Sequence, residues 1–174
     1  MPLSDEGRSQ ARRLAARLRD ERFDVIYASD LLRAFETASI VAEPHGLTVR
    51  KDPRLREFDF GDWEGLTWDE IVATRPHLQE HALTAASLYA PDGGETFAMV
   101  CDRLRPFFDE LRASPSAHAA IVMHAGPLHA ALAVLGIDEH GQRFAPASLT
   151  RITMEAGRPR LISVSDVRHL DSPG

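Results

Sequence analysis

Two side chains that can carry positive charge, Arg33 and His124, stand where the sequence places the carboxyl ends of two buried strands. Residues 24–28 (DVIYA) form a short apolar run, and Arg33 lies in the first turn of the segment that follows it. Residues 119–123 (AAIVM) form a second such run, and His124 comes directly after it. Because ligands of open α/β sheets bind beyond the carboxyl ends of the strands, both residues stand at the expected ligand site.

Both residues also begin or precede predicted helices, whose free backbone N–H groups favour anions. A guanidinium group can hold two oxygens of one phosphate, and a nearby histidine could donate a hydrogen bond, carry a proton or act as a nucleophile. A plainer interpretation exists for each residue. Arg33 could pair with Asp30 or Glu36 on its own helix, and His124 could be a strand-end residue bonded to the backbone. Spacing alone favours the plainer interpretations, whereas the shared place at two strand ends favours a ligand site.

The pattern of hydrophobic residues predicts helices and strands that alternate along a single domain of residues 1–174. Helices are expected after Ser4, over residues 31–43 with Ser29 and Asp30 as caps, near 68–73, over 95–112 and from Pro127. Strands are expected at residues 24–28, more weakly at 47–51, at 119–123, and in a hairpin of 150–154 and 160–164. Such alternation predicts an α/β fold, a three-layer α/β/α sandwich with a mostly parallel sheet, to which the hairpin adds an antiparallel edge.

The composition restricts the class of protein. With 44% hydrophobic and 26% charged residues, a chain of 174 residues is globular and long enough to bury a core. No apolar run approaches about 20 residues and the first residues are polar, so we expect a cytoplasmic protein without a membrane span or a secretory signal. The net charge of −6 argues against nucleic acid as a partner. The single Cys101 excludes an internal disulfide and a zinc site built from cysteines.

Several blocks of the sequence follow one another with a familiar spacing. They are residues 2–11 (PLSDEGRSQA), 24–38 (DVIYASDLLRAFETA), 54–65 (RLREFDFGDWEG), 93–96 (GGET) and 122–126 (VMHAG). Together the blocks resemble the motifs of the histidine phosphatase superfamily, in its phosphoglycerate mutase-like group, over nearly the whole chain. The resemblance implies an enzyme that moves a phosphoryl group from a small phosphorylated substrate onto a histidine, and then to water or another acceptor.

The resemblance also implies roles for single residues of the phosphate-binding site. Arg33 would grip the phosphoryl group, and His124 would donate a hydrogen bond that stabilises charge in the transition state. Ala125 and Gly126 would complete the phosphate-binding loop, although Ala125 stands where the family usually has glycine. We expect neither a cofactor nor a metal ion.

Glu57 would be the proton donor to the leaving oxygen, by the same resemblance. A general acid must keep its proton near neutral pH, so the pKa of Glu57 has to be raised. A bound phosphate and partial burial among aromatic side chains would supply that rise. The aromatic residues of this block are Phe58, Phe60 and Trp63. The plainer interpretation is a surface carboxylate paired with Arg54 or Arg56.

The family's R-H-G motif, which ends its first strand and carries the nucleophilic histidine, has no counterpart in the printed sequence. Met1 stands where the family already enters its first helix, so we expect the first strand to be missing and the chain as written to be inactive. A start placed too far downstream would explain the gap. Arg168 and His169 could replace the motif in a permuted chain, but residues 165–170 (SDVRHL) resemble the usual end of the family, and no glycine follows.

By descent, the expected function is that of a phosphomonoesterase acting on a small phosphorylated metabolite, with free phosphate as the other ligand. The alternative is a non-catalytic relative that binds a phosphorylated ligand or a protein through Arg33 and His124. A metal hydrolase that uses His124 and His129 is disfavoured, because a spacing of five does not place two ligands on one helix face. Residues 74–91 would border the site and carry no telling motif, so the substrate, the choice between phosphatase and mutase, and a homodimer stay open.

Overall fold

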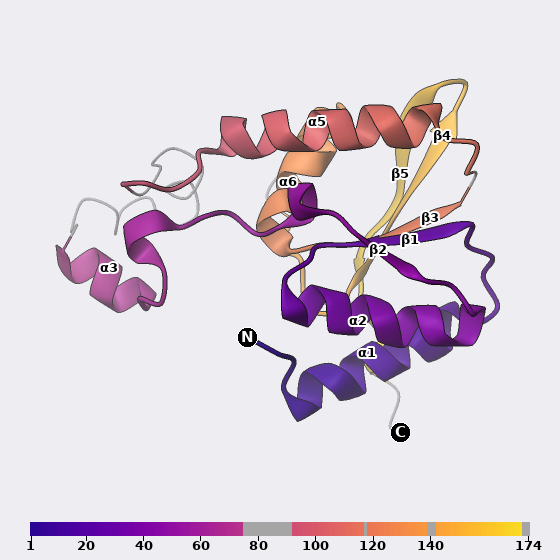
Figure 1. The fold of residues 1–174 in the computed structure, drawn as a ribbon, viewed down its shortest axis with the longest axis horizontal. Coiled ribbons are helices and arrows are strands. Elements are labelled where there is room, and N and C mark those ends of the chain that lie inside the picture. Colours follow the sequence, from indigo (N-terminus) through magenta and orange to yellow (C-terminus); the bar gives the residue numbers. More distant parts are fainter. Residues whose placement is uncertain (75–91, 117, 139–141, 172–174) are drawn as a thin grey trace.

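A computed structural model describes residues 1–74, 92–116, 118–138 and 142–171 of the protein (Figure 1). The helices are α1 (Asp5–Leu18), α2 (Leu32–Ala42), α3 (Trp68–Thr74), α5 (Phe97–Ala113) and α6 (Ala125–Val134). The strands are β1 (Val25–Ala28), β2 (Val49–Lys51), β3 (Ala119–Val122), β4 (Leu149–Glu155) and β5 (Arg158–Asp166). Residues 75–91, which the sequence expects beside the site, lie outside the described residues. No helix in the described ranges is long and apolar enough to cross a membrane.

Three parallel strands bring their carboxyl ends to one edge of a sheet with the order β2-β1-β3. Ala28, the last residue of β1, lies opposite Lys51 of β2 and Val122 of β3. The N–H of Ser29 then donates to the carbonyl oxygen of Val122 (2.9 Å). On the other side, the N–H of Asp52 donates to the carbonyl oxygen of Ala28 (2.8 Å). The residues that follow the three strands therefore emerge side by side, which is where a ligand site is expected.

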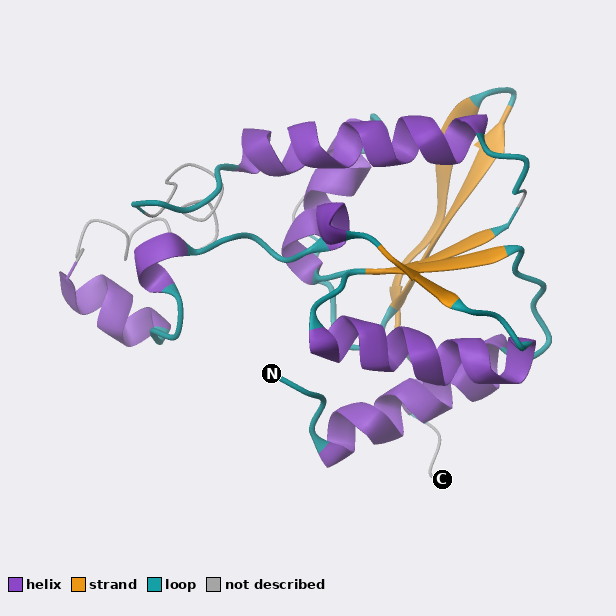
Figure 2. Cartoon of the chain, viewed as in Figure 1, coloured by secondary structure: helices purple, strands orange, loops and turns teal. Residues whose placement is uncertain are grey.

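Helices cover both faces of this sheet, with α1 and α2 on one side and α5 and α6 on the other (Figures 1 and 2). Side chains alternate between two cores along β1. Ile26 and Ala28 pack with α1 and α2, whereas Tyr27 packs into the core beneath α5 and α6. The buried members of this second core are Leu55, Val100, Leu104, Phe107, Phe108, Ala130 and Ala131. The predicted α/β fold with a mostly parallel sheet is confirmed.

The C-terminal hairpin is confirmed as an antiparallel pair of β4 and β5. Its turn consists of Ala156 and Gly157, whose φ angles of 49° and 77° are both positive, as in the favoured two-residue turns of hairpins. The pair forms a two-stranded sheet of its own, whereas the sequence expects it as an edge of the parallel sheet. The reason is that no described strand pairs with the outer edge of β3, so no ladder of hydrogen bonds joins the two sheets.

The predicted N-cap is confirmed for α1 and is wrong for α2. Ser4 caps α1, and its hydroxyl oxygen accepts a hydrogen bond from the N–H of Gly7 (3.1 Å). Ser29 and Asp30 do not cap α2, whose cap residue is Leu31 without a side-chain bond. The prediction fails because both side chains are turned to partners at the site, His124 for Ser29 and an arginine for Asp30.

The start of α6 lies at Ala125, two residues before the predicted start at Pro127. Proline has no N–H to donate, and in the first turn of a helix none is needed, so Pro127 is accommodated further inside the helix than expected. The earlier start makes His124 the cap residue of α6 and places Ala125 and Gly126 in its first turn.

Candidate active site

Arg33 is a cation without a counter-ion among the described residues. Its guanidinium group forms no hydrogen bond or ion pair there, although Asp30 and Glu36 stand three residues away on either side. Asp30 accepts two hydrogen bonds from Arg56 (2.7 and 2.6 Å). Glu36 is paired with Arg8 of α1 (3.0 Å). The plainer interpretation, in which Arg33 pairs with Asp30 or Glu36, is therefore wrong.

A hollow of about 430 Å³ opens beside Arg33, between the start of α1, the first turns of α2 and residues 146–147. Its polar lining consists of Ser4, Glu6, Gln10, Arg33 and Thr37. The volume is that of a site for a small ligand. Neither Glu57 nor His124 lines the hollow, so it adds space next to Arg33 and does not enclose all three predicted site residues.

His124 lies at the cap position of α6, directly after β3, and its ring faces Ser29. Nε2 of His124 is 2.9 Å from Oγ of Ser29, so the ring makes a side-chain hydrogen bond in place of the backbone bond of the plainer interpretation. Burial, together with the charges of Arg33 and Arg103, lowers the pKa of His124 to about 4. The imidazole is therefore neutral near pH 7 and carries a single N–H.

Ser29 belongs to the site, although the sequence does not single it out as a functional residue. It follows β1 directly and is completely buried. Its hydroxyl oxygen accepts a hydrogen bond from the N–H of Leu31 (3.3 Å) and faces the ring of His124. A buried hydroxyl group at this place holds the imidazole in one orientation. The signal that could have revealed Ser29 is its position directly after a buried strand, which is the signal that reveals His124.

Glu57 is half-buried and lies against the first turn of α6. The N–H of Phe58 donates to Oε1 of Glu57 (3.1 Å), and the backbone of Gly126 contributes a further hydrogen bond. A Cβ atom on Gly126 would lie only 2.4 Å from Oε1, so glycine is what leaves room for the carboxyl group. Burial raises the pKa of Glu57, although the backbone hydrogen bonds and the charges of Arg33 and Arg103 oppose the rise. This carboxyl group therefore keeps its proton to a higher pH than an exposed glutamate.

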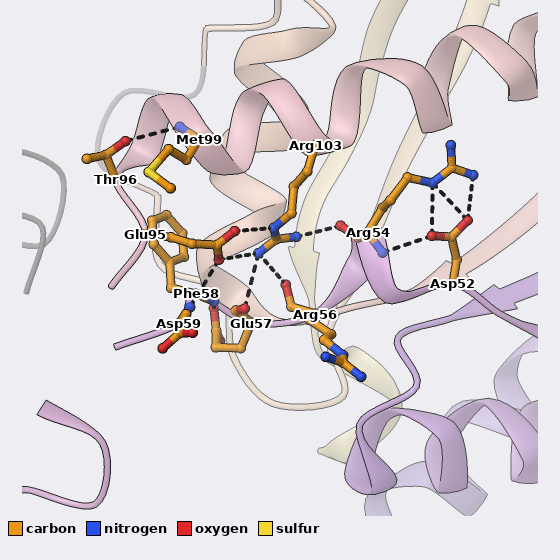
Figure 3. A network of polar contacts seen from close by, with 10 residues as sticks. All are labelled: Asp52, Arg54, Arg56, Glu57, Phe58, Asp59, Glu95, Thr96, Met99 and Arg103. Atoms are coloured by element: carbon orange, nitrogen blue, oxygen red, sulfur yellow. Dashed lines mark hydrogen bonds and ion pairs between the residues drawn. The ribbon is translucent and has the colours of Figure 1, made fainter. Parts of the chain in front are cut away.

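The two arginines that flank Glu57 in the sequence have other partners. Arg54 binds Asp52 at 2.6 Å and Glu110 at 2.7 Å. Arg56 is exposed and binds the carboxylate of Asp30, just before α2. Figure 3 shows the side chains of Arg54 and Arg56 directed away from the Glu57 carboxyl group. The interpretation of Glu57 as the surface partner of Arg54 or Arg56 is therefore wrong.

The aromatic cover of Glu57 agrees with the sequence only in part. The ring of Phe58 meets the first turn of α6 at the same point as the Glu57 carboxyl group. Phe58 also stacks with Phe60 and Phe97, with ring centroids 6.2 and 6.5 Å apart. Trp63 is buried in a separate cluster. The apolar cover thus comes from Phe58 and the rings stacked on it.

The three predicted site residues lie together at the carboxyl ends of β1 and β3. Arg33 lies four residues after Ser29, whose hydroxyl group is 2.9 Å from the His124 ring, and the positive charge of Arg33 acts on both His124 and Glu57. Glu57 also touches Gly126, two residues after His124. A guanidinium group, a neutral imidazole and a carboxyl group with a raised pKa can together hold an anion, donate to it and deliver a proton.

The alternative histidine sites do not form within the described residues. Arg168 and His169 lie in a short 3-10 turn, and Nε2 of His169 is 2.9 Å from the carbonyl oxygen of Ala147. The ring of His129 packs edge-on against Phe144, with ring centroids 4.7 Å apart. No group of three or more side chains that could hold a metal ion is found in the part of the chain that the structure describes.

A family model described as the histidine phosphatase superfamily (branch 1) matches residues 1–167. The chain belongs to this superfamily. The matched range includes Arg33, Glu57 and His124, and a phosphoglycerate mutase-like protein of Arabidopsis thaliana is among the chain's relatives. The family that the motifs indicate is therefore confirmed.

Two curated relatives are phosphatases. Phosphoserine phosphatase 1 of Hydrogenobacter thermophilus is 35% identical over 138 residues, which are 78% of this chain and 65% of the relative. The glucosyl-3-phosphoglycerate phosphatase of Mycobacterium tuberculosis is 39% identical over 142 residues, which are 76% of this chain and 63% of the relative. The chain therefore spans slightly less than two thirds of the length of either relative.

Solved structures of the family share the fold. The mycobacterial glucosyl-3-phosphoglycerate phosphatase in complex with VO3 superposes with a TM-score of 0.85 at 34% sequence identity. The superposition covers 95% of this chain and 88% of that chain. The α/β fold predicted from the sequence is confirmed by this likeness.

Proposed function

We propose that the protein is a phosphomonoesterase of the histidine phosphatase type, which acts on a small phosphorylated metabolite. One observation carries the proposal: the partly buried guanidinium group of Arg33 has no counter-ion among the described residues. It lies near His124, which is neutral, and near Glu57, whose pKa is raised. A phosphoryl group would supply a counter-ion for Arg33, and a guanidinium fork matches two of its oxygens.

The three side chains divide the chemistry between them. Arg33 holds two phosphoryl oxygens. With the Ser29 hydroxyl group donating to Nε2 of His124, the single N–H of the ring lies on Nδ1 and donates to the transferring group as charge develops on it. When the bond between phosphorus and the leaving oxygen breaks, that oxygen takes the proton of Glu57, so the product departs as an alcohol. The phosphoryl group passes to a histidine nitrogen, as the family resemblance implies, and then to water.

The relatives include phosphatases as well as 2,3-bisphosphoglycerate-dependent phosphoglycerate mutases, and the proposal of a phosphatase follows the two phosphatases described above. The two curated phosphatases are named for phosphoserine and glucosyl-3-phosphoglycerate, both small phosphorylated molecules, and the solved relative is bound to VO3, an oxyanion that can stand in for a phosphoryl group. The hollow of about 430 Å³ beside Arg33 has room for the alcohol part of such a substrate. The cytoplasmic location and the homodimer stay predictions.

The nucleophile would be the histidine of an R-H-G motif, which the family resemblance implies. The test is to read the gene upstream in frame and to assay the longer chain with p-nitrophenyl phosphate and phosphoserine. We expect hydrolysis, with kcat/KM lowered about 100-fold or more by Glu57→Gln, because a positioned general acid contributes about that factor. Arg112→Gln, which alters an exposed arginine of α5, is the control. A longer chain that carries R-H-G and hydrolyses no phosphomonoester would contradict the proposal.

The second candidate function is binding of a phosphorylated ligand without turnover. It is favoured by one observation, that the Arg33 guanidinium group forms no hydrogen bond or ion pair among the described residues and stands close to the neutral His124, because these two groups can hold an anion without a nucleophile. It predicts that the 174-residue chain binds inorganic phosphate in a calorimeter and that Arg33→Ala weakens the binding, while no hydrolysis occurs with or without an upstream extension. A chain that shows no anion binding at all would exclude this function.

A further inference from the structure

We infer that Arg103, together with Glu95, is a positioning residue for Glu57. The inference rests on the proposed function, in which Glu57 delivers the proton. The pair of Arg103 and Glu95 forms a clamp. The clamp holds the backbone around Glu57 to helix α5 and so determines where the Glu57 carboxyl group can lie.

The guanidinium group of Arg103 grips the backbone of the Glu57 loop at three carbonyl oxygens (Figure 3). Nη1 donates to the carbonyl oxygen of Arg54 (2.5 Å), and Nη2 donates to those of Arg56 (2.9 Å) and Glu57 (3.1 Å). One planar group thus joins the carbonyl oxygens of three residues in this loop. A lysine has a single ammonium point and cannot reproduce this fork.

Glu95 completes the clamp from the other side. Its carboxylate accepts hydrogen bonds from Nε (2.7 Å) and Nη2 (2.9 Å) of Arg103, which fixes the plane of the guanidinium group. The same carboxylate accepts the N–H of Asp59 (3.0 Å), and the N–H of Glu95 donates to the carbonyl oxygen of Asp59 (2.8 Å). The side chains of Arg103 and Glu95 are only 19% and 20% exposed. Glu57 therefore lies on a stretch of backbone that is held on both sides of it.

The clamp connects Glu57 to α5, which packs against α6, the helix that begins next to His124. Arg103 belongs to α5, and α5 packs against α6 through the core that contains Leu104 and Ala130. The Glu57 carboxyl group lies within contact distance of Gly126 in the first turn of α6. A loop tied to α5 can therefore keep its carboxyl group against α6, whereas a free loop would let this group turn to solvent.

Two roles are conceivable for Arg103, and they predict different changes at Glu57. Among the described residues, the charges that act on the Glu57 carboxyl are Arg33 from α2 and Arg103 from α5, and both oppose the rise of its pKa, while the titratable His124 lies two residues before Gly126, against which this carboxyl lies. If Arg103 acts through its charge alone, a lysine in its place preserves that effect. If it acts by position, a lysine loosens the loop, the carboxyl group gains solvent, and its pKa falls toward that of an exposed glutamate.

The test is a pH titration of the Glu57 side-chain carboxyl carbon by NMR in the 174-residue chain and in the variant Arg103→Lys. We expect the titration midpoint of Glu57 to shift downward in Arg103→Lys. The matched control is Arg112→Lys on the same helix, whose exposed pair with Asp109 lies at 3.3 Å, and in this variant the midpoint should stay at the wild-type value. An unchanged Glu57 midpoint in Arg103→Lys would overturn the inference.

A second variant keeps the inference testable if Arg103→Lys does not fold. Glu95→Asp preserves the charge of the clamp but shortens its reach to Arg103 and Asp59. Because the charges are the same, a downward shift of the Glu57 midpoint in Glu95→Asp supports positioning. A wild-type midpoint in this folded variant would count against it.

The titration needs no turnover, so it separates the inference from the proposed function. An inactive longer chain with a downward shift in Arg103→Lys would end the proposed function and leave the clamp in place. In an active longer chain, Arg103→Lys should lower kcat by about 100-fold with little change in KM, the scale that misplacement of a reacting group produces. The fall of kcat with rising pH should also begin at lower pH, because the acid loses its proton earlier.

Discussion

The arginines that hold the loop of residues 52–59 are paired with carboxylates, whereas Arg33 of the site has no such partner among the described residues. In the loop, hydrogen bonds from Arg56 lower the pKa of Asp30. At the site, burial raises the pKa of Glu57 and lowers that of His124. The pairs of the loop are Arg54 with Asp52 and Glu110, Arg56 with Asp30, and Arg103 with Glu95.

This difference shows how ion pairs in the loop can both stabilise the fold and leave Arg33 available for binding. Paired charges fix the loop, while the two carboxylates nearest to Arg33 in sequence, Asp30 and Glu36, are occupied by Arg56 and Arg8. A guanidinium group kept free in this way can meet an anion without first breaking an ion pair. The expected consequence is that loss of a paired loop arginine such as Arg54 mainly lowers stability, whereas loss of Arg33 mainly lowers binding.

The largest effect is expected from Arg33→Gln on binding. The affinity for inorganic phosphate should fall by about 100-fold, because a charged hydrogen-bonding partner of a buried anion is lost. The midpoint of thermal unfolding should hardly change, since Arg33 has no described ion pair to lose. Calorimetry and a thermal melt of the same sample check both statements, with Arg112→Gln as the control. A large loss of thermal stability without a loss of affinity would place Arg33 with the loop residues.

The next largest effect is expected from Arg54→Ala on stability. The carboxylate of Asp52, whose side chain is only 12% exposed, would lose its guanidinium partner, and the free energy of unfolding should fall by about 2 kcal/mol. Urea denaturation measures this fall. Arg112→Ala breaks an exposed pair and should change the free energy by less than about 0.5 kcal/mol. Equal losses in the two variants would mean that the buried pair has no special contribution.

The site and the paired loop should lose stability in different pH ranges. The folded pKa of His124, about 4, lies below its ordinary value, so only the unfolded chain takes up this proton as the pH falls from about 6.5 toward 4. Stability is therefore lost in this window, by about 1 kcal/mol once screening by solvent is allowed for. The loss should be absent in His124→Gln. The paired carboxylates should lose their contribution only below about pH 4, in both chains.

Urea denaturation between pH 7 and 3 distinguishes these windows. Burial raises the pKa of Asp52, but the hydrogen bonds and the charge of Arg54 lower it by more. Asp52→Asn should therefore remove part of the stability change that the wild type shows below about pH 4. Identical slopes for the wild type and His124→Gln between pH 7 and 5 would show that the ring is not buried as described.

The smallest effect is expected from Arg56→Gln on binding. Without Arg56, the carboxylate of Asp30 is free to pair with Arg33, three residues further along the chain. A solvent-exposed pair of this kind is worth about 0.5 kcal/mol, so phosphate affinity should fall about twofold. The double variant Arg56→Gln with Asp30→Asn should regain the wild-type affinity. If the affinity does not recover, Asp30 is not the competitor, and the free state of Arg33 has another cause.

The sequence predicts those features that short-range patterns decide. Hydrophobic runs locate β1 and β3, the Ser4 cap locates the start of α1, and the rule for strand ends selects Arg33 and His124 before any resemblance is used. Glu57 follows only from the family motif, because its burial depends on a distant glycine, Gly126. Spacing alone favours the plainer interpretation of Glu57.

Partners that are distant in sequence explain the rest. Asp30 and Glu36 look like partners for Arg33, but Arg56 and Arg8, 26 and 28 residues away, take them in the folded chain. The sequence pattern around Arg103 does indicate a buried charge. Arg103 lies between Val100 and Phe107 at helical spacing on the buried face of α5, and a charge there needs a buried partner.

The central claim is that Arg33 and His124 form an anion pocket while the arginines of the neighbouring loop are already satisfied. NMR titration of the 174-residue chain with inorganic phosphate, observed at the arginine Nε–H and histidine ring signals, tests it most directly. We predict saturable shifts for Arg33 and His124, with Arg54 and Arg103 unchanged. Saturable shifts at the loop arginines, or none at Arg33, would contradict the account.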